Sequence, residues 1–578
     1  MQFYLSQFVN LNDNSGSMTE WSKVSVLKID IPKVSWVRIP LFPMLNFFMF
    51  SILIEKVMLT PVFIKYNFFL FFENNFYHSN YGFNETLILE ILPECSLIFF
   101  IFYSLINLFN DKMTIIFQYY KWLFYFSLIL YLLVIKYITF SYNNSELICG
   151  FSWLNSYYTL VSKILIILLT LIVLFISKRK IASFSKLNYF IEFPLIIAFS
   201  VLFMFLLSSS YDFFGTYLII EGLSLTLYIL ASLLHQGIIS VESSIKYFSL
   251  GAVASGNLLL GIVILFGLIG SLDFLTIQNY LGNDNLINSI FEVKFSLGLI
   301  FFAFFFKISA FPCHVWVADV YEGIWSPITA FFAIVLKSCL ILFFLRILFD
   351  VFLNILIIFK PLFIVVSLGS MIVGSFGALK QVRIKRFLAY TSISQVGFIL
   401  LGVSSGNLLG LSASLMYLLL YIVMNVLFFT IFLNIEHVIL NKNVIYLSDL
   451  YGLSYYTKEA GKHLALTILS MAGLPPLGGF VGKLFLYFSI IEAHLDFILV
   501  TSLIISLVST FYYLNFLRYL FFEKHFETKL YYYVKKSELT FLLRFCSFIL
   551  ITFIIFIPNY IDFFLKLSFS CMWPFINF

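Results

Sequence analysis

The chain has 578 residues, of which 61% are hydrophobic and 11% are charged, and its formal net charge is +6. Its mean hydropathy is +1.00. Soluble domains are about half apolar and about a quarter charged, so this composition excludes a water-facing fold of this size. The apolar runs are continuous, and many reach about twenty residues, which favours membrane-spanning helices over a barrel. The sequence therefore predicts an all-α polytopic membrane protein.

Metal and nucleotide sites are not expected in this chain. Its six cysteines are scattered, without a C-x-x-C pair, which argues against an iron–sulfur cluster, a zinc site or a disulfide framework. No G-x-G-x-x-G fingerprint is present, so we expect no NADH site. The Gly-Lys-Leu at 482–484 lacks the other residues of a phosphate-binding loop. We expect no cofactor and no nucleic-acid partner.

The first 85 residues differ from the rest and are interpreted as an N-terminal extension. Residues 1–40 are polar and basic, loosely like a mitochondrial targeting segment. A second interpretation is that residues 37–40, Val-Arg-Ile-Pro, translate the T-arm of a tRNA gene. A gene model extended upstream would then explain the segment, and the true start would lie at or beyond Met44. The apolar stretch 41–72 is a candidate for an extra helix.

A transmembrane domain is predicted over 86–566, followed by a C-terminal tail over 567–578. The apolar runs define about fourteen spans. They lie near 86–109, 115–140, 156–177, 189–210, 213–234, 241–270, 293–311, 326–349, 353–378, 387–404, 408–434, 464–490, 496–521 and 541–566.

Basic residues lie almost entirely in the loops that follow odd-numbered spans. These loops carry Lys112, Lys178, Arg179, Lys180, Lys186, Lys380, Arg383, Lys385, Arg386, Lys442, Lys458, Lys462, Arg518, Lys524, Lys529, Lys535 and Lys536. Loops after even-numbered spans carry essentially none, and Arg346 lies at a span end. Loop Lys and Arg mark the cytoplasmic or matrix side of a membrane. Both ends of the transmembrane domain are therefore predicted to face the opposite side.

Ionisable residues inside the spans are the strongest functional signal. They are Glu221, Lys246, Lys307, Lys337 and Lys483. Each costs roughly 2.5–3.5 kcal/mol at the bilayer centre on insertion scales, and a series of such groups is typical of an ion or proton path. The alternatives are that each lysine extends to the membrane surface, and that the carboxylate forms a local stabilising pair.

Helix-breaking residues accompany two of these lysines. Pro312 follows Lys307, and a Gly- and Pro-rich stretch over 473–479 precedes Lys483. Proline removes a helix hydrogen bond and glycine loosens the backbone, so spans 7 and 12 are expected to be discontinuous. They occupy corresponding positions of two five-helix units, spans 4–8 and 9–13, which would be inverted repeats. Broken helices in such repeats indicate a transport site.

His314 follows the break in span 7 and has two interpretations. It is either an interfacial histidine or a proton relay between two lysines. Its neighbour Cys313 is interpreted as a packing residue. Asp319 and Glu322 are interpreted as loop or cap residues, without a chemical role.

The segment 307–337, KISAFPCHVWVADVYEGIWSPITAFFAIVLK, resembles the signature of the antiporter-like subunits of respiratory complex I, and its D-x-YEG variant resembles the subunit 2 type. The stretches LPECSLI (92–98), SSSYDFFGTYLIIEGLSL (208–225), IKYFSLGAVASG (245–256), RIKRFLAYTSISQVGF (383–398) and AGLPPLGGFVGKLFLYF (472–488) are also similar to this family. The resemblance covers most of 86–525.

This resemblance implies fourteen helices and two half-channels joined by a polar axis. It assigns proton translocation to a carboxylate on helix 5 and to lysines on helices 7, 8, 12 and sometimes 6, which by motif are Glu221, Lys307, Lys337, Lys483 and Lys246. His314 is added as a candidate relay. A lysine at 483 argues against the subunit 4 type, and no long lateral helix follows span 14, which argues against type 5.

Two positions depart from the family pattern. Trp325 stands where a small residue is usual, with a possible shift of helix 8. Gln395 stands where many members have a histidine, which would rearrange a water path through helix 10.

The function implied is that of a proton-translocating membrane-arm subunit of NADH:ubiquinone oxidoreductase. Flavin, iron–sulfur clusters and quinone are expected in other subunits, and the partners are other membrane-arm subunits and the lipid bilayer. A pair of carboxylate and lysine that forms and breaks would switch the lysine between holding and releasing a proton. The alternatives are a stand-alone cation/proton antiporter subunit and a helical scaffold with vestigial charges.

The bias toward Phe (75) and Tyr (35) follows AT-rich codons and favours an organellar genome. We therefore expect a multi-pass protein of the mitochondrial inner membrane, with a bacterial or plastid membrane as the alternative.

The mature N-terminus is predicted to lie at or beyond Met44, because residues 37–40 read as a translated tRNA arm. Mass spectrometry of the purified complex should find no peptide from residues 1–40. Detection of such peptides would contradict this interpretation.

Overall fold

The computed structural model describes residues 129, 146–148, 152–183, 189–234, 237–282, 291–437, 442–522, 531–533, 537–553 and 557–572. The chain divides into two compact units, Met1–Phe83 and Asn84–Phe578, and every described residue belongs to the second. The N-terminal extension and, apart from Ile129, the first two predicted spans lie outside the described residues.

The described elements are almost all helices. The helices are α5 (Tyr157–Ser183), α6 (Tyr189–Ser209), α7 (Phe213–Ala231), α8 (Ile238–Ile269), α9 (Phe274–Leu281), α11 (Phe291–Ile308), α12 (Val315–Gly323), α13 (Ser326–Phe331), the π-helical η1 (Phe332–Leu336), α14 (Lys337–Asp350), α15 (Leu353–Leu379), α16 (Ile384–Ser405), α17 (Leu408–Asn434), the 3-10 helix η2 (Leu447–Leu450), α18 (Leu453–Tyr456), α19 (Lys458–Ala472), α20 (Gly478–Glu492), α21 (Asp496–Phe521), α22 (Ser537–Thr552) and α23 (Ile557–Met572). The strands are β1 (Glu146–Ile148), β2 (Trp153–Asn155), β3 (Ile435–His437), β4 (Lys442–Asn443) and β5 (Tyr531–Tyr533), and they form the antiparallel sheets β1-β2 and β4-β3-β5.

The predicted class, an all-α multi-pass membrane protein, is confirmed. Within the described ranges nine helices are long and apolar enough to cross a membrane. The break expected in span 7 lies at its end: α11 stops at Ile308, and residues 309–314 separate it from α12. Predicted span 12 is interrupted by residues 473–477, between α19 and α20. The total of fourteen spans and the inverted repeats stay predictions.

The last predicted span, 541–566, differs from the structure. It consists of two helices, α22 and α23, and α23 continues to Met572, into the segment that was predicted as a tail. Both helices pack against α17, and α23 also packs against α5 and α14.

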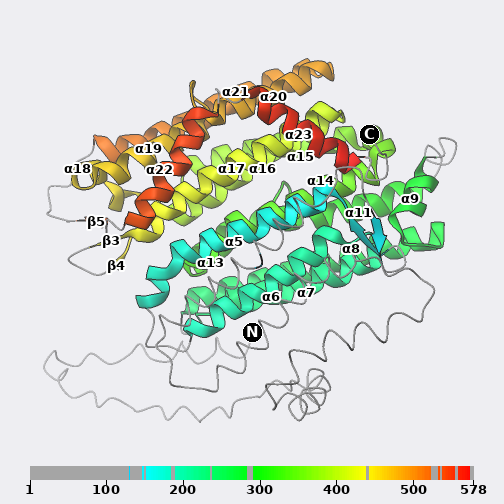
Figure 1. The fold of residues 1–578 in the computed structure, drawn as a ribbon, viewed down its shortest axis with the longest axis horizontal. Coiled ribbons are helices and arrows are strands. Elements are labelled where there is room, and N and C mark those ends of the chain that lie inside the picture. Colours follow the sequence, from blue (N-terminus) through cyan, green and yellow to red (C-terminus); the bar gives the residue numbers. More distant parts are fainter. Residues whose placement is uncertain are drawn as a thin grey trace, which may run out of the picture. The chain divides into compact units, whose positions relative to one another are not determined.

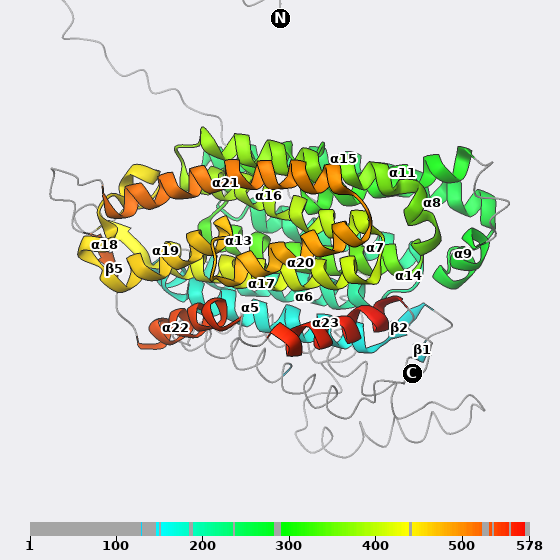
Figure 2. The same cartoon turned by 90° about the horizontal axis from the view of Figure 1, so that it is seen from above.

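Burial separates central from peripheral helices. The stretch Ser326–Asp350, from α13 through α14, is entirely buried, and α16 and α17 are nearly so. By contrast, most residues in the apolar stretches of α8 and α21 are not buried. An apolar helix that is buried on every side belongs to the core of a bundle. Figure 2 shows α16 and α17 between α21 and the pair α22 and α23.

The helix connections gather at two opposite ends of the bundle. At one end, the loops after α15 and α17 meet where Arg383 bridges Tyr446, and β3 pairs with β5 beyond α21. At the other, Trp153 bridges Ser210 and Asp212 bridges Asp273. Loops after odd-numbered spans thus contact one another, and loops after even-numbered spans do likewise. Figure 1 shows the helices inclined in a common direction between these ends.

The loops 178–188 and 380–386 are predicted to face the same side, the matrix or cytoplasm, because basic residues cluster in both. Lys180, in the last turn of α5, and Lys385, in the first turn of α16, are near enough for their charges to repel each other, so the two basic segments lie at the same end of the bundle. Tags inserted in both loops should be protected from a protease added on the outer side, whereas a tag at 270–272, after α8, should be cleaved. Cleavage in either basic loop would overturn the topology.

Candidate functional site

Lys483 lies at the break between α19 and α20. Its side chain is 4% exposed. Its Nζ donates to the carbonyl oxygens of Met471 at 3.3 Å and Ala472 at 3.0 Å and lies 4.7 Å from the centre of the Phe398 ring. The last carbonyls of a helix lack intrahelical donors and carry the negative end of the helix dipole. The break therefore creates the binding site of the ammonium group.

Lys307 lies in the last turn of α11, immediately before the break over 309–314. At this break the Phe306 carbonyl oxygen accepts from the Ser309 N–H at 3.1 Å and from Trp316 Nε1 at 3.0 Å, and not from the lysine. His314 lies directly before α12, where its ring stacks on Phe311 with the centroids 6.1 Å apart. The break thus leaves the Lys307 ammonium available to other groups.

Glu221 lies in the middle of α7 and acts electrostatically on Lys307. Within the part of the chain that the structure describes, the two side chains form no direct ion pair. The carboxylate has one weak contact, from Ser224 Oγ to its Oε2 at 3.5 Å, and its buried Oε1 has no hydrogen-bond partner among the described residues. Glu221 and Lys307, the pair predicted from the sequence, therefore lie near each other but do not form an ion pair.

Lys337 is the most deeply buried of the predicted lysines, at 2% exposure. Its Nζ donates to Ser392 Oγ of α16 at 2.8 Å and lies 5.5 Å from the centre of the Tyr321 ring. The π-helical turn η1 ends directly before it. Such turns insert an extra residue into a helix and are frequent at functional sites. No pattern in the sequence predicted this turn.

Lys246 lies near the start of α8, in an ion-pair network and not among buried apolar residues. Its Nζ contacts Glu242 at 2.7 Å and Asp319 at 3.1 Å, and its side chain is 43% exposed. Arg386 of α16 also pairs with Asp319, at 3.3 Å. This contact links α8 to α12 and α16.

Glu322, one turn after Asp319 on α12, binds Arg383 and Arg386. Sequence reasoning treated both carboxylates as loop or cap residues. The signal that could have found them is their spacing of three, which places them on one face of a helix.

Helix α16 connects the two most buried lysines. Ser392 contacts Lys337 and Phe398 contacts Lys483, with Gln395 midway between them. The predicted residues therefore form two groups, one around Glu221 and Lys307 and one along α16, with Lys246 in its own network.

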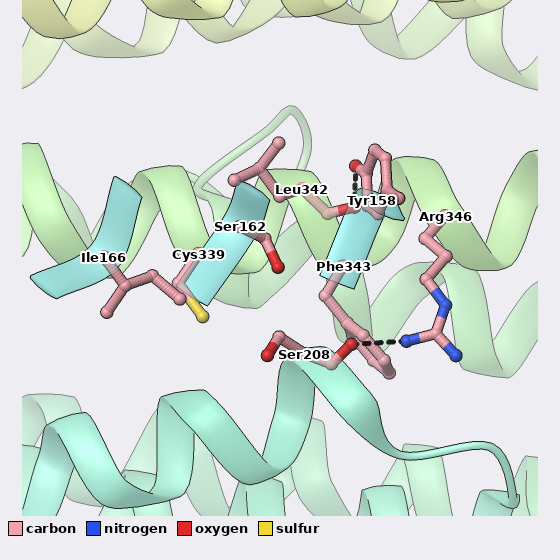
Figure 3. A pocket seen from close by; sticks show the side chains of 8 residues that line it. All are labelled: Tyr158, Ser162, Ile166, Ser208, Cys339, Leu342, Phe343 and Arg346. Atoms are coloured by element: carbon pink, nitrogen blue, oxygen red, sulfur yellow. Dashed lines mark hydrogen bonds between the residues drawn. The ribbon is translucent and has the colours of Figure 1, made fainter. Parts of the chain in front are cut away.

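A small cavity lies beside α14, away from Lys337 (Figure 3). Tyr158, Ser208 and Cys339 are among the residues that line it. Arg346 also lines it, is 2% exposed, and donates to the carbonyl oxygens of Ser208 and Ser210 at the end of α6. Nine residues separate Arg346 from Lys337, which places them on opposite faces of the helix. The cavity is therefore separate from the lysine site.

A family model described as NADH:quinone oxidoreductase/Mrp antiporter, TM, matches residues 210–509. The chain belongs to this antiporter family. All six predicted site residues, Glu221, Lys246, Lys307, His314, Lys337 and Lys483, lie within the matched range.

Similar proteins agree with this assignment. The NADH-quinone oxidoreductase subunit N of Pelagibacter ubique is 37% identical over 369 residues, 63% of this chain and 76% of that protein. The subunit N of Paramagnetospirillum magneticum is 35% identical over 355 residues, 61% of this chain and 71% of that protein.

Two solved structures share the fold. A chain of respiratory complex I from Thermus thermophilus has a TM-score of 0.67 and 25% identity, over 81% of this chain and 98% of that chain. A chain of the Mrp complex from Dietzia has a TM-score of 0.70 and 18% identity, over 84% and 98%, and shows the fold alone.

Gly473→Ala should lower proton transport by disturbing Lys483. Gly473 has φ +83°, and an added Cβ would lie 3.0 Å from Cδ and 3.1 Å from Nζ of Lys483. Gly270→Ala is the matched control, with φ +81° and open space around the added carbon. Each variant should lose about 1 kcal/mol of stability from the left-handed conformation.

Only Gly473→Ala should reduce proton pumping several-fold, measured by dye quenching in membrane vesicles that contain equal amounts of assembled complex. Equal pumping by the two variants would show that the Lys483 position tolerates the displacement.

Proposed function

We propose that this chain is a proton-translocating membrane-arm subunit of an NADH:quinone oxidoreductase, the respiratory complex I. Family membership and the relatives named NADH-quinone oxidoreductase subunit N support this proposal. The structural likeness to a chain of Thermus complex I, at 25% identity, adds further support.

The observation that carries the proposal is the surroundings of Lys337 and Lys483. Both are almost fully buried, and both bind neutral oxygen atoms, a hydroxyl in one case and two carbonyls in the other. Among the described residues neither forms an ion pair with a carboxylate. A permanently charged buried lysine requires a counter-ion to offset its desolvation. Neutral oxygen acceptors can accept hydrogen bonds from both the ammonium and the amine form of a lysine. They therefore fit a lysine that alternately holds and releases a proton.

Glu221 would control the first step. Proximity of a carboxylate favours the charged form of a lysine, and burial favours the neutral form. Movement of Glu221 toward or away from Lys307 would therefore make the lysine take up or release a proton. In this structure Glu221 and Lys307 interact electrostatically without forming an ion pair, which would be the state in which the carboxylate has moved away from the lysine. Lys337 and Lys483 would pass the proton on through the second group of residues along α16.

The redox chemistry belongs, in this proposal, to other subunits, which would carry the flavin, iron–sulfur clusters and quinone. The partners would be neighbouring membrane-arm subunits. A stand-alone cation/proton antiporter is the second candidate, because the family model covers both classes. Co-purification of the chain with NADH:quinone oxidoreductase activity separates them, since an antiporter would purify without it.

We further propose a mitochondrial inner-membrane location, supported by the abundance of Phe and Tyr that AT-rich organellar codons produce. The relatives named above are bacterial, so a bacterial membrane is the alternative. Detection of the chain in a purified mitochondrial inner-membrane fraction tests the location.

Lys307→Ala and Glu221→Gln should each abolish most proton pumping while the complex still assembles. Removing one charge removes the partner whose approach and departure would change the charge state of the other, so the proton switch would be lost. Lys307→Arg should rescue only part of the pumping, because guanidinium does not release its proton in this range. The measurement is protons translocated per NADH oxidised, with assembly checked by native gel.

Lys294→Ala is the matched control on the same helix, about three and a half turns away, and should pump normally. NADH oxidation by an artificial acceptor should persist in every variant. Normal pumping by a fully assembled Lys307→Ala complex would mean that Lys307 is structural.

A further inference from the structure

Gln395 is held between two tyrosines of neighbouring helices. Its Nε2 donates to the hydroxyl oxygen of Tyr513 on α21 at 3.2 Å, and its Oε1 accepts a hydrogen bond from the hydroxyl of Tyr417 on α17. All three side chains are buried, at 1–3% exposure. The amide therefore has a partner at each end, and the three residues form a clamp across α16, α17 and α21.

The clamp lies between the two most buried lysines. Ser392, which binds Lys337, is one turn before Gln395 on α16, and Phe398, which contacts Lys483, is one turn after it. Three helical residues rise about 4.5 Å, so Gln395 is about that distance along the axis from each contact. A proton that moves between the two lysines along α16 must pass this position.

Further buried polar groups lie on the Lys337 side of the clamp. The hydroxyls of Tyr321 and Tyr421 lie beside Ser392, and the Tyr421 hydroxyl also lies beside Asn425. Among the described residues, neither these two hydroxyls nor the Asn425 Nδ2 form a well-aligned hydrogen bond. Tyr417, Tyr421 and Asn425 follow at intervals of four on α17 and so share one face. Buried unsatisfied groups require an explanation such as bound water. On the Lys483 side the rings of Phe398 and Tyr417 pack together, with centroids 5.8 Å apart.

We propose that Gln395, Tyr417 and Tyr513 form a gate that interrupts proton transfer between Lys337 and Lys483 when the clamp is closed, as in this structure. The gate opens when the amide leaves the two hydroxyls and water from the Tyr421 side enters. This inference rests on the proposed function, since it concerns the route of the same protons.

The chemistry of an amide explains the interruption. A carboxamide accepts at oxygen and donates at nitrogen, but has no ionisable proton near neutral pH. Transfer through the closed clamp would protonate Gln395 Oε1, release an Nε2 proton to Tyr513, and leave the unstable imidic acid. Hydroxyl groups and water exchange protons without such an intermediate, so the path conducts only when water replaces the amide.

Two substitutions at this position should have opposite effects. Gln395→Leu removes both hydrogen bonds and leaves an apolar side chain that holds no water, so pumping should fall at least five-fold. Gln395→His places an imidazole there, which accepts a proton at one nitrogen and donates from the other. This variant should conduct without opening, and passive proton entry into vesicles without NADH should rise several-fold.

Both variants are measured in the assembled complex, with NADH oxidation by an artificial acceptor as the check on integrity. Ser404→Ala is the matched control, because this buried serine lies nine residues after Gln395, on the opposite face of α16, where its hydroxyl donates to the Leu401 carbonyl of its own helix. It should change neither pumping nor passive leak.

A purely structural clamp predicts that both Gln395 variants weaken assembly and that neither leaks. Normal pumping by Gln395→Leu, or the absence of a leak in Gln395→His, would overturn the gate. Normal pumping by Gln395→Leu together with lost pumping in Lys307→Ala would overturn the gate proposal but leave the proposed function standing. Normal pumping by both would overturn the proposed function as well.

Discussion

Where a helix breaks inside a bilayer, its last carbonyl groups lose their partners, and no water is present in hydrocarbon to replace them. Among the described residues, the helices that carry Lys307 and Lys483 lie at such breaks, and the carbonyls at each break find different partners. At the first break the Ser309 N–H and Trp316 Nε1 both donate to the carbonyl of Phe306. At the second, Lys483 donates to two carbonyls of α19. At the first break Lys307 does not bind the carbonyl, whereas at the second break Lys483 is bound by uncharged oxygen atoms.

The remaining site follows from the central position of α14 and α16. Because Ser326–Asp350 is fully enclosed by protein, Lys337 has no route to a membrane surface and must find its partner within the bundle. Its partner is a serine hydroxyl of α16, the helix that also presents a phenylalanine to Lys483. Lys246, Asp319 and Arg386 do not belong to this site. Their ion pairs hold α8, α12 and α16 together.

The sequence alone predicted those features that depend on the local order of residues, namely charges within apolar runs and helix breaks. Charges within apolar runs predicted Glu221 and the lysines as site residues, which stays a prediction, and Pro312 and the Gly- and Pro-rich stretch indicated both breaks. It could not identify Ser392 as the partner of Lys337, because 55 residues separate them and their contact depends on helix packing. The π-helical turn, the division of the last span and the clamp at Gln395 likewise arise from tertiary contacts that have no signature in local periodicity.

The central claim is that the buried lysines serve proton transfer and do not stabilise the fold. Lys337→Met tests it most directly, because methionine fills similar space without a charge, and replacing buried charges with apolar groups is often neutral or stabilising. The measurement is protons translocated per NADH oxidised by the assembled complex. The account predicts a complex at least as heat-stable as the unsubstituted one with a strongly reduced ratio. An unchanged ratio in a stable complex would contradict it.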